Sequence, residues 1–189
     1  ASSLNIPAVK TLQSVGMENT IDFAHRLGVT SLGEAGQYDL SLALGGGQVS
    51  LLQLSTAFGA LANTGYYTGN TSILDISDAD GNLIYAYAPD QKPPLQILDP
   101  RLVWLISDIL SDDSARSIGF GLNSTLKLDR TAAVKTGTTT NFHDNWTIGY
   151  TPSYVVGVWV GNNDNSPMNP AIASGVTGAS PIWNKIMTA

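Results

Sequence analysis

The stretch that decides the fold reads Ala132-Ala133-Val134-Lys135-Thr136-Gly137-Thr138-Thr139. Its apolar start and its threonines favour an extended strand over residues 132–138. Two more runs rich in strand-forming residues follow at 144–150 and 154–161, and the intervening Thr151-Pro152-Ser153 is typical of a tight turn. Consecutive strands joined by short connections pair antiparallel, so the last third of the chain predicts an antiparallel sheet of three strands.

Helical patterns precede this sheet. Apolar residues recur with helical spacing over 6–15 and 21–27, and each run ends at a glycine, which predicts two short helices. A third helix is predicted from 51 to the region of 63–65. Ser50 and Gln53 match the capping box, in which the serine caps the helix and the glutamine side chain reaches back.

The middle of the chain predicts a β-hairpin and a further helix. Two strand-like runs at 73–76 and 83–87 flank an Asp-Gly turn, which is the sequence pattern of a hairpin. Asp99-Pro100 supplies an N-cap and a first-turn proline for a helix that runs through Leu110. Residues 111–127 are rich in Ser, Asp and Gly, so we predict an irregular segment there.

A last helix is predicted at the C-terminus, where Ser180-Pro181 repeats the N-cap and first-turn pattern. The predicted order is therefore helices, hairpin, helix, three strands and helix. This order favours an α+β fold in which helices flank an antiparallel sheet. Because no internal repeat or low-complexity linker divides the chain, we predict one domain over residues 1–189.

Composition excludes several classes of function. Lys and Arg total 9 against 15 for Asp and Glu, and the formal net charge of -6 argues against nucleic acid and anionic lipid as partners. The absence of cysteine excludes disulfides and cysteine metal sites. No apolar run is long enough to span a membrane, and Ala1 opens neither a signal peptide nor a chain with an initiating Met. We therefore expect a fragment.

The histidines and paired acids make poor metal sites. His143-Asp144 offers one imidazole and one carboxylate, fewer ligands than a metal centre uses. Asp78 and Asp80 have the spacing of a calcium loop, but the bidentate Glu that ends such a loop is missing. We therefore expect neither a metal nor a cofactor.

The chemistry of the chain concentrates in Lys135-Thr136-Gly137-Thr138, at the end of the first predicted strand. An extended peptide could lie along this strand edge through main-chain hydrogen bonds, and Gly137 would permit close approach. The hydroxyls of Thr136 and Thr138, with the charge of Lys135, suit a carboxylate. The pattern predicts an acyl-transfer site for a peptide with a free carboxyl end. Threonine and glycine at a strand end are also ordinary turn residues, so the tripeptide alone does not decide.

Further stretches make the combination specific. Serine acyl-transferases of the penicillin-recognising group combine Ser-x-x-Lys, Ser-x-Asn and Lys-Thr-Gly in that order. Ser3-Leu4-Asn5 and Lys135-Thr136-Gly137 match the second and third elements. The chain resembles the C-terminal half of the transpeptidase domain of class A penicillin-binding proteins, a β-lactamase-like α+β fold, along the stretches 3–9, 42–65, 144–152, 156–162 and 175–183.

The resemblance implies roles for individual residues. Ser3 would relay protons between two lysines, and Lys135 would support Ser3 electrostatically. The backbone N–H of Thr138 would form half of an oxyanion hole. Asp144 and Trp146 are interpreted as structural residues. Substrate-binding roles, to the peptide carbonyl or the terminal carboxylate, fall on Asn5, Thr136, Gly137 and Thr138.

The nucleophile of the family is not found where it belongs. The Ser-x-x-Lys element should precede Ser3, and only two residues do. A formal match at Ser124-Thr125-Leu126-Lys127 lies in the wrong order and in the predicted irregular segment, so we interpret it as a chance match. We expect the nucleophile in the upstream half of the same domain, and we expect this chain alone not to react with penicillin.

The resemblance implies a peptidoglycan D,D-transpeptidase that forms an acyl-enzyme with stem peptides ending in D-Ala-D-Ala and that binds β-lactam antibiotics. The whole protein would add a membrane anchor and a glycosyltransferase domain, and would face the outside of the bacterial cytoplasmic membrane. Two alternatives share the motifs. One is a serine β-lactamase or D,D-carboxypeptidase, against which the class A-like stretch 42–65 argues. The other is a non-catalytic penicillin-binding or sensor domain of the same fold.

Overall fold

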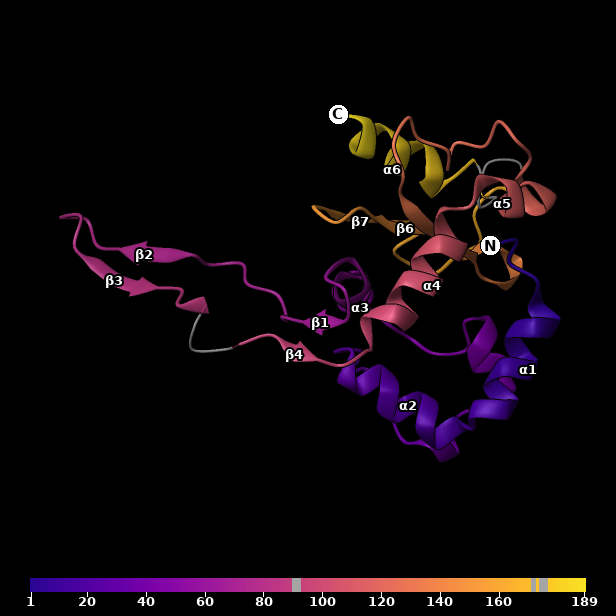
Figure 1. Cartoon of the computed structure of the whole chain (residues 1–189), viewed down its shortest axis with the longest axis horizontal. Coiled ribbons are helices and arrows are strands. Elements are labelled where there is room, and N and C mark those ends of the chain that lie inside the picture. Colours follow the sequence, from indigo (N-terminus) through magenta and orange to yellow (C-terminus); the bar gives the residue numbers. More distant parts are fainter. Residues whose placement is uncertain (90–92, 171–172, 174–176) are drawn as a thin grey trace.

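In the part of the chain that the structure describes, an antiparallel sheet of three strands lies at the centre (Figure 1). The structure is a computed structural model, and it describes residues 1–89, 93–170, 173 and 177–189. The strands follow one another in sequence and in space, in the order β5 (Ala133–Thr138), β6 (Asp144–Tyr150) and β7 (Val155–Gly161). This arrangement confirms the sheet that the last third of the sequence predicts.

Alternation along the strands gives this sheet two different faces. Lys135 lies opposite Ile148 on one face, and Thr136 lies opposite Thr147 on the other. The face with Ile148 also includes Tyr150, which contacts Phe58 edge-on and shares a 2.8 Å hydrogen bond with the hydroxyl of Ser107. The two faces therefore receive different helices.

Helix α6 (Ala179–Thr188) covers the face that includes Thr147. Trp183 is fully buried at the centre of the core between α6 and the sheet, and it packs with Val134 and Val158. A side chain at Gly149 would place its Cβ only 2.4 Å from Cζ2 of Trp183, so the absence of one lets the helix approach the sheet. The predicted C-terminal helix is confirmed, and it covers this face of the sheet.

The predicted N-cap of α6, Ser180, is wrong by two residues. The N-cap is Gly178, and its side chain can offer no capping acceptor. Ser180 lies inside the helix, fully buried, with its hydroxyl 3.1 Å from that of Thr147. The side chain of Asn145 takes over the capping, because its Oδ1 accepts the N–H of Ala179 over 2.6 Å. A cap from another element leaves no local sequence signal.

Helix α3 (Leu51–Ala62) packs against β6 and β7 on the opposite face. The Ser50 cap is confirmed, because its Oγ accepts the N–H of Gln53 over 3.1 Å. The reciprocal half of the predicted capping box is wrong. The Gln53 side chain instead donates to the hydroxyl of Thr30 over 3.2 Å, which ties α3 to the loop after the second helix. A tertiary contact has thus replaced a local one.

The two helices predicted at the N-terminus are confirmed. They are α1 (Asn5–Val15) and α2 (Met17–Arg26), and Gly16 and Gly28 follow them with φ of 85° and 86°. Residues Ile21, Val29, Leu32 and Ala57 form a second buried cluster that joins α2 to α3. The short 3-10 helices η1 (Ala35–Gln37) and η2 (Leu40–Leu44) connect these parts.

Helix α4 (Pro100–Ser111) confirms the predicted cap, because Oδ1 of Asp99 accepts the N–H of Arg101 over 2.9 Å. The prediction of an irregular segment over 111–127 is wrong in part, since α5 (Asp113–Phe120) occupies it. This helix is organised around Arg116, which is 2% exposed and donates to the carbonyls of Leu110 and Leu126. A polar helix held by a buried guanidinium shows no apolar periodicity, so sequence reasoning misses it.

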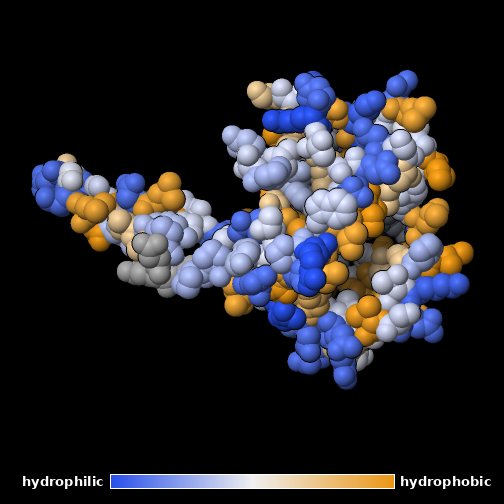
Figure 2. All heavy atoms as spheres, in the orientation of Figure 1, coloured by the Kyte–Doolittle hydropathy of each residue, from blue (hydrophilic) through white to orange (hydrophobic). Residues whose placement is uncertain are grey.

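The predicted hairpin is confirmed as an arm that projects away from the body of the molecule (Figure 1). It consists of β2 (Asp75–Ser77) and β3 (Leu83–Ala86), and β1 (Tyr66–Tyr67) pairs with β4 (Leu95–Gln96) at its base. Its apolar side chains are exposed, as Figure 2 shows. Among the helices that the structure describes, none is long and apolar enough to cross a membrane.

Candidate active site

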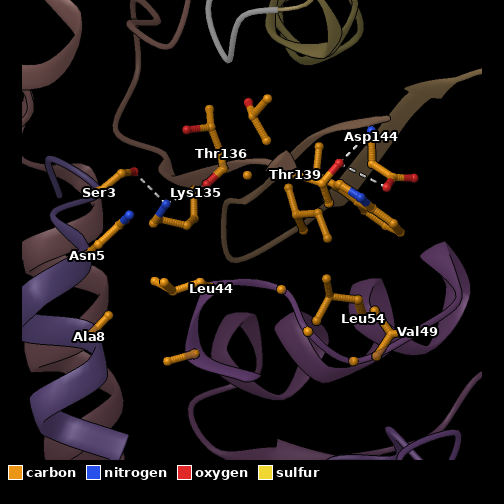
Figure 3. Close-up of a pocket in the computed structure, with 18 of the residues that line it drawn as sticks. Ser3, Asn5, Ala8, Leu44, Val49, Leu54, Lys135, Thr136, Thr139 and Asp144 are labelled. Atoms are coloured by element: carbon orange, nitrogen blue, oxygen red, sulfur yellow. Dashed lines mark hydrogen bonds between the residues drawn. The ribbon is translucent and has the colours of Figure 1, made fainter. Parts of the chain in front are cut away.

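A cleft of about 1620 Å³ lies between the N-terminal segment, the segment 43–51 that leads into α3, and strand β5 (Figure 3). One wall carries the predicted polar residues of the site. The opposite wall is apolar, with Leu44, Val49, Leu54 and Phe58. Sequence reasoning missed these apolar lining residues, because a helical apolar stripe looks the same whether it faces a core or a cleft.

The free edge of β5 faces this cleft. In the described part of the sheet, β5 pairs with β6 only, so its other edge has no strand partner. The N–H of Thr139 donates to the carbonyl of Asp144 over 3.1 Å. Hydrogen-bonded and non-bonded pairs alternate in an antiparallel ladder, so the backbone groups of Thr136 and Thr138 point to the free edge. An extended peptide therefore finds main-chain donors and acceptors there.

Ser3 and Lys135 meet in the cleft, as predicted from residues 132 positions apart. Nζ of Lys135 donates to Oγ of Ser3 over 2.6 Å, and it also donates to the carbonyl of Thr136 (Figure 3). Ser3 has a φ of 55°, a left-handed conformation that costs a non-glycine residue free energy and that clusters at functional sites. The neighbouring Ser2 fixes this segment, because its hydroxyl donates to the carbonyl of Ala115 over 2.6 Å.

The environment of Lys135 changes its acidity. Burial lowers the pKa of its ammonium group below the ordinary value of 10.5, because desolvation penalises the charged form. Among the described residues, no carboxylate forms an ion pair with it. A desolvated lysine held against a serine hydroxyl is chemically suited to move a proton or to attract an incoming anion.

Asn5 is the first residue of α1, and its side chain points into the cleft beside Ser3 (Figure 3). The first residue of α1 and the segment just before it therefore place Asn5 and Ser3 on the wall that faces β5. The amide can donate or accept a hydrogen bond, so it can contact a peptide group that lies in the cleft. The structure thus brings Ser3, Asn5 and Lys135 into one site.

The predicted residues Thr136, Gly137 and Thr138 also line the cleft, but the strand presents them differently. Gly137 shares a face with Lys135 and lies over Trp146, where a Cβ would sit 3.7 Å from that of the tryptophan. The threonine side chains emerge on the other face, at the free edge. Thr136 is buried and Thr138 is exposed, so Thr138 offers the more accessible hydroxyl.

Asp144 and Trp146 line the cleft too. Asp144 has the expected structural role: it accepts the indole N–H of Trp159 over 2.8 Å and the hydroxyl of Thr139 over 3.1 Å, while its own N–H donates to that hydroxyl (Figure 3). These bonds close the connection between β5 and β6. Trp146 is half-buried beneath Gly137, so it forms part of the cleft wall and not of the core.

The formal Ser-x-x-Lys match at 124–127 lies outside this cleft. Oγ of Ser124 accepts the N–H of Leu126 over 3.1 Å, as in an ordinary turn, and Lys127 is exposed. In the described residues, no three His, Cys, Asp or Glu side chains gather closely enough to hold a metal ion.

Comparison with known proteins places this chain in a family. Residues 1–188 match the family described as penicillin binding protein transpeptidase domain. The chain belongs to this family, within the class A penicillin-binding protein lineage that the sequence stretches resemble. Among the stretches that resemble class A proteins in sequence, 175–183 is described only in part, because Gly175 and Val176 lie outside the described residues.

The chain is similar to penicillin-binding proteins 1A of several bacteria. The chain is 33% identical over 184 residues to penicillin-binding protein 1A of Aquifex aeolicus, covering 97% of this chain and 24% of that protein. It is 31% identical over 200 residues to the Clostridium perfringens protein of that name, covering 98% of this chain and 27% of that protein. The chain therefore spans about a quarter of the length of these relatives.

Solved structures share the fold. The chain superposes on penicillin-binding protein 1A from Haemophilus influenzae with a TM-score of 0.82 at 22% identity, covering 98% of this chain and 32% of that one. It matches the PonA1 protein from Mycobacterium tuberculosis in complex with penicillin V with a TM-score of 0.71 at 23% identity, covering 91% and 49% respectively. The α+β transpeptidase fold predicted from the sequence is confirmed.

Proposed function

We propose that this chain forms the substrate-binding half of the active site of a peptidoglycan D,D-transpeptidase. The observation that carries the proposal is the 2.6 Å contact between Nζ of Lys135 and Oγ of Ser3, across a cleft bordered by a free strand edge. The stem peptide ending in D-Ala-D-Ala binds along that edge. Its terminal carboxylate lies near Thr136 and Thr138, and its peptide carbonyl lies near Asn5.

The reaction needs a serine nucleophile from a segment outside this chain, carried in a Ser-x-x-Lys element. That serine attacks the carbonyl between the two D-alanines, the C–N bond breaks, and an acyl-enzyme ester forms. The backbone N–H of Thr138, which points to the free edge, stabilises the oxyanion. The proton of the attacking serine passes through the lysine of its Ser-x-x-Lys element and Ser3 to the amine of the departing D-Ala. An amine of a second stem peptide then attacks the ester, and its proton returns by the same relay to the serine that is released.

Lys135 supports both ends of this reaction. Its ammonium attracts the carboxylate of the substrate, and its hydrogen bond fixes the direction of the Ser3 hydroxyl. The lowered pKa of Lys135 follows from burial, and it reduces the cost of proton movement along the pair. The same carboxylate-binding edge would hold the carboxylate of a β-lactam, so β-lactam antibiotics are proposed as inhibitors.

The rest of the protein is part of the proposal. The upstream half of the domain covers the cleft and brings the nucleophile, and a membrane anchor and a glycosyltransferase domain belong to the whole protein. The site would then work on the extracytoplasmic side of the bacterial cytoplasmic membrane. The exposed apolar face of α4, with Leu102, Trp104, Leu105 and Ile109, is a surface that the upstream half would bury.

Intact-mass measurement after exposure to benzylpenicillin tests the proposal. The full-length protein should gain one penicilloyl group, and peptide mapping should place it on the serine of an upstream Ser-x-x-Lys. The 189-residue chain alone should gain none. An adduct on Ser3 or Ser124, or no adduct on the full-length protein, would overturn the proposal. The rates of exchange and of hydrolysis of the terminal D-Ala of a stem peptide can also be compared. Exchange faster than hydrolysis would identify a transpeptidase and argue against a carboxypeptidase or β-lactamase.

A further inference from the structure

A fully buried amide, Asn145, lies directly behind the substrate edge of the cleft. It stands opposite Thr138 in the β5–β6 ladder, on the face covered by α6. Nδ2 of Asn145 donates to Oγ1 of Thr138 over 3.0 Å and to the carbonyl of Ala173 over 3.5 Å. Its Oδ1 accepts the N–H of Ala179, the first residue of α6, over 2.6 Å. The amide therefore links the N-terminus of α6 to the edge of the site.

The orientation of this amide follows from its partners. The N–H of Ala179 can only donate, so the group 2.6 Å away must be the oxygen of Asn145, and the nitrogen must face Thr138. Gly178 makes the short contact possible, because a Cβ there would lie 2.5 Å from Oδ1. The helix start thus fixes which end of the amide points at the strand.

This orientation determines what the Thr138 hydroxyl can do. A hydroxyl has one proton to donate, and Oγ1 of Thr138 already accepts a proton from Asn145. It cannot donate back to that nitrogen, so its own proton is directed to another acceptor. Thr138 is exposed at the free edge, where the proposed substrate places its carboxylate. A hydroxyl that receives one hydrogen bond is also polarised toward giving another.

We propose that Asn145 is a positioning residue that keeps the Thr138 hydroxyl as a hydrogen-bond donor, and so tunes the site for ligands with a free carboxylate. The proposal rests on the proposed function, because it assumes that the carboxylate binds at this edge. Asn145 does not touch the ligand. It acts through Thr138, and α6 acts through Asn145.

Acylation of the full-length protein by benzylpenicillin and by its methyl ester measures this effect. The ester has the same β-lactam but no carboxylate. Asn145→Ala should reduce the second-order rate constant for benzylpenicillin about tenfold, the size of one lost hydrogen bond to a charged group, and leave the ester within about twofold. Thr147→Val is the matched control, because it removes a buried hydrogen bond to Ser180 between the same strand and helix without touching Thr138. It should preserve the ratio of the two rates.

A second pair of variants separates positioning from structural support. If Asn145 acts through the hydroxyl, Asn145→Ala should have no further effect on the ratio when Thr138 is already valine. Asn145→Asp keeps the shape of the side chain, but a carboxylate accepts the Thr138 proton. The rate constant for benzylpenicillin divided by that for the ester should therefore fall below the value for the Ala variant. This variant carries the test if the Ala variant unfolds, as thermal unfolding would reveal.

The outcomes are distinguishable. Equal losses for both β-lactams, or an unchanged loss in the Thr138→Val background, would overturn the role of Asn145 while leaving the proposed function in place. A wild-type protein that prefers the ester, or that is not acylated at all, would overturn the proposed function and this inference with it.

Discussion

Lys135→Met should separate the stability of this fold from its activity. Methionine fills a similar volume with a neutral side chain, so it removes the ammonium and its two hydrogen bonds, to Oγ of Ser3 and to the carbonyl of Thr136. A hydrogen bond from a charged donor contributes about 1.5–3 kcal/mol. At about 1.4 kcal/mol for each tenfold change, the Ser3 contact alone predicts a loss of about 10- to 150-fold in acylation rate. The lost attraction for the substrate carboxylate adds to this, so we expect at least about a 100-fold loss.

The same substitution should make the protein more stable. Burial lowers the pKa of Lys135, so the unfolded chain binds the proton more tightly than the folded one. Wild-type stability therefore rises as pH increases from the folded-state pKa toward 10.5, and at neutral pH the buried ammonium costs free energy. Lys135→Met should therefore raise the free energy of unfolding at pH 7, because the lowered pKa indicates that the desolvation cost of the buried ammonium exceeds what its two hydrogen bonds return. The gain should shrink toward pH 10.5.

Two measurements on the full-length protein check this prediction: the rate of acylation by a fluorescent penicillin, and thermal unfolding. Lys127→Met is the matched control, because Lys127 is exposed and belongs to the chance Ser-x-x-Lys match. It should change neither quantity. Acylation of Lys135→Met within about threefold of wild type, a change too small for a lost charged hydrogen bond, would refute the reasoning. So would a large loss in Lys127→Met.

Three further predictions concern the framework of the site. Gly149→Ala should destabilise the domain by about 2 kcal/mol or more, because its Cβ would lie 2.4 Å from the ring of Trp183 and 2.8 Å from a strand carbonyl. Urea unfolding measures this loss of stability. Gly36→Ala is the control, because nothing lies within 4 Å of a Cβ at that position. Trp183→Ala should lower the free energy of unfolding by about 3–5 kcal/mol, since the indole is fully buried. A shift of the urea unfolding midpoint no larger than that caused by replacing an exposed side chain with alanine would contradict this. Hydrogen bonds from the side chain of Arg101 and from its backbone N–H lower the pKa of Asp99 to about 2. The contribution of Asp99 to stability is therefore present above the ordinary pKa of 3.8 and disappears as pH falls toward 2. Asp99→Asn should therefore lower the unfolding midpoint at pH 6 but not at pH 2.

Local patterns predicted most of the elements because each pattern reflects a contact within a few residues. Ser50 caps α3 and Asp99 caps α4 through their own backbone neighbours, so the sequence signal and the hydrogen bond coincide. The runs of strand-forming residues over 132–161 likewise correspond to extended segments that pair with their neighbours in sequence. Sequence reasoning failed where the partner is distant. Arg116 organises α5 through carbonyls of other segments, and Asn145 caps α6 from a strand.

In the candidate site, too, sequence reasoning identified the residues but not how they are arranged. The residue types at Ser3, Asn5 and 135–138, with the family resemblance, were sufficient to name the polar side of the cleft. Their arrangement was not predictable from spacing alone. That Thr138 faces Asn145, and not the Lys135 side, depends on the register between β5 and β6. That the cleft has an apolar wall depends on where α3 packs.

The sequence by itself determined the three strands of the central sheet, the hairpin and most helix ends, because these depend on short-range sterics, caps and turn residues. The family followed from the motifs and the stretches around them. Only the tertiary structure decided that Nζ of Lys135 reaches Oγ of Ser3, that the free edge of β5 borders the cleft, and that a buried amide directs the Thr138 hydroxyl. The physical reason is that these contacts join residues far apart in the chain. Their distances are set by how helices pack on the two faces of the sheet, and no local pattern encodes that packing.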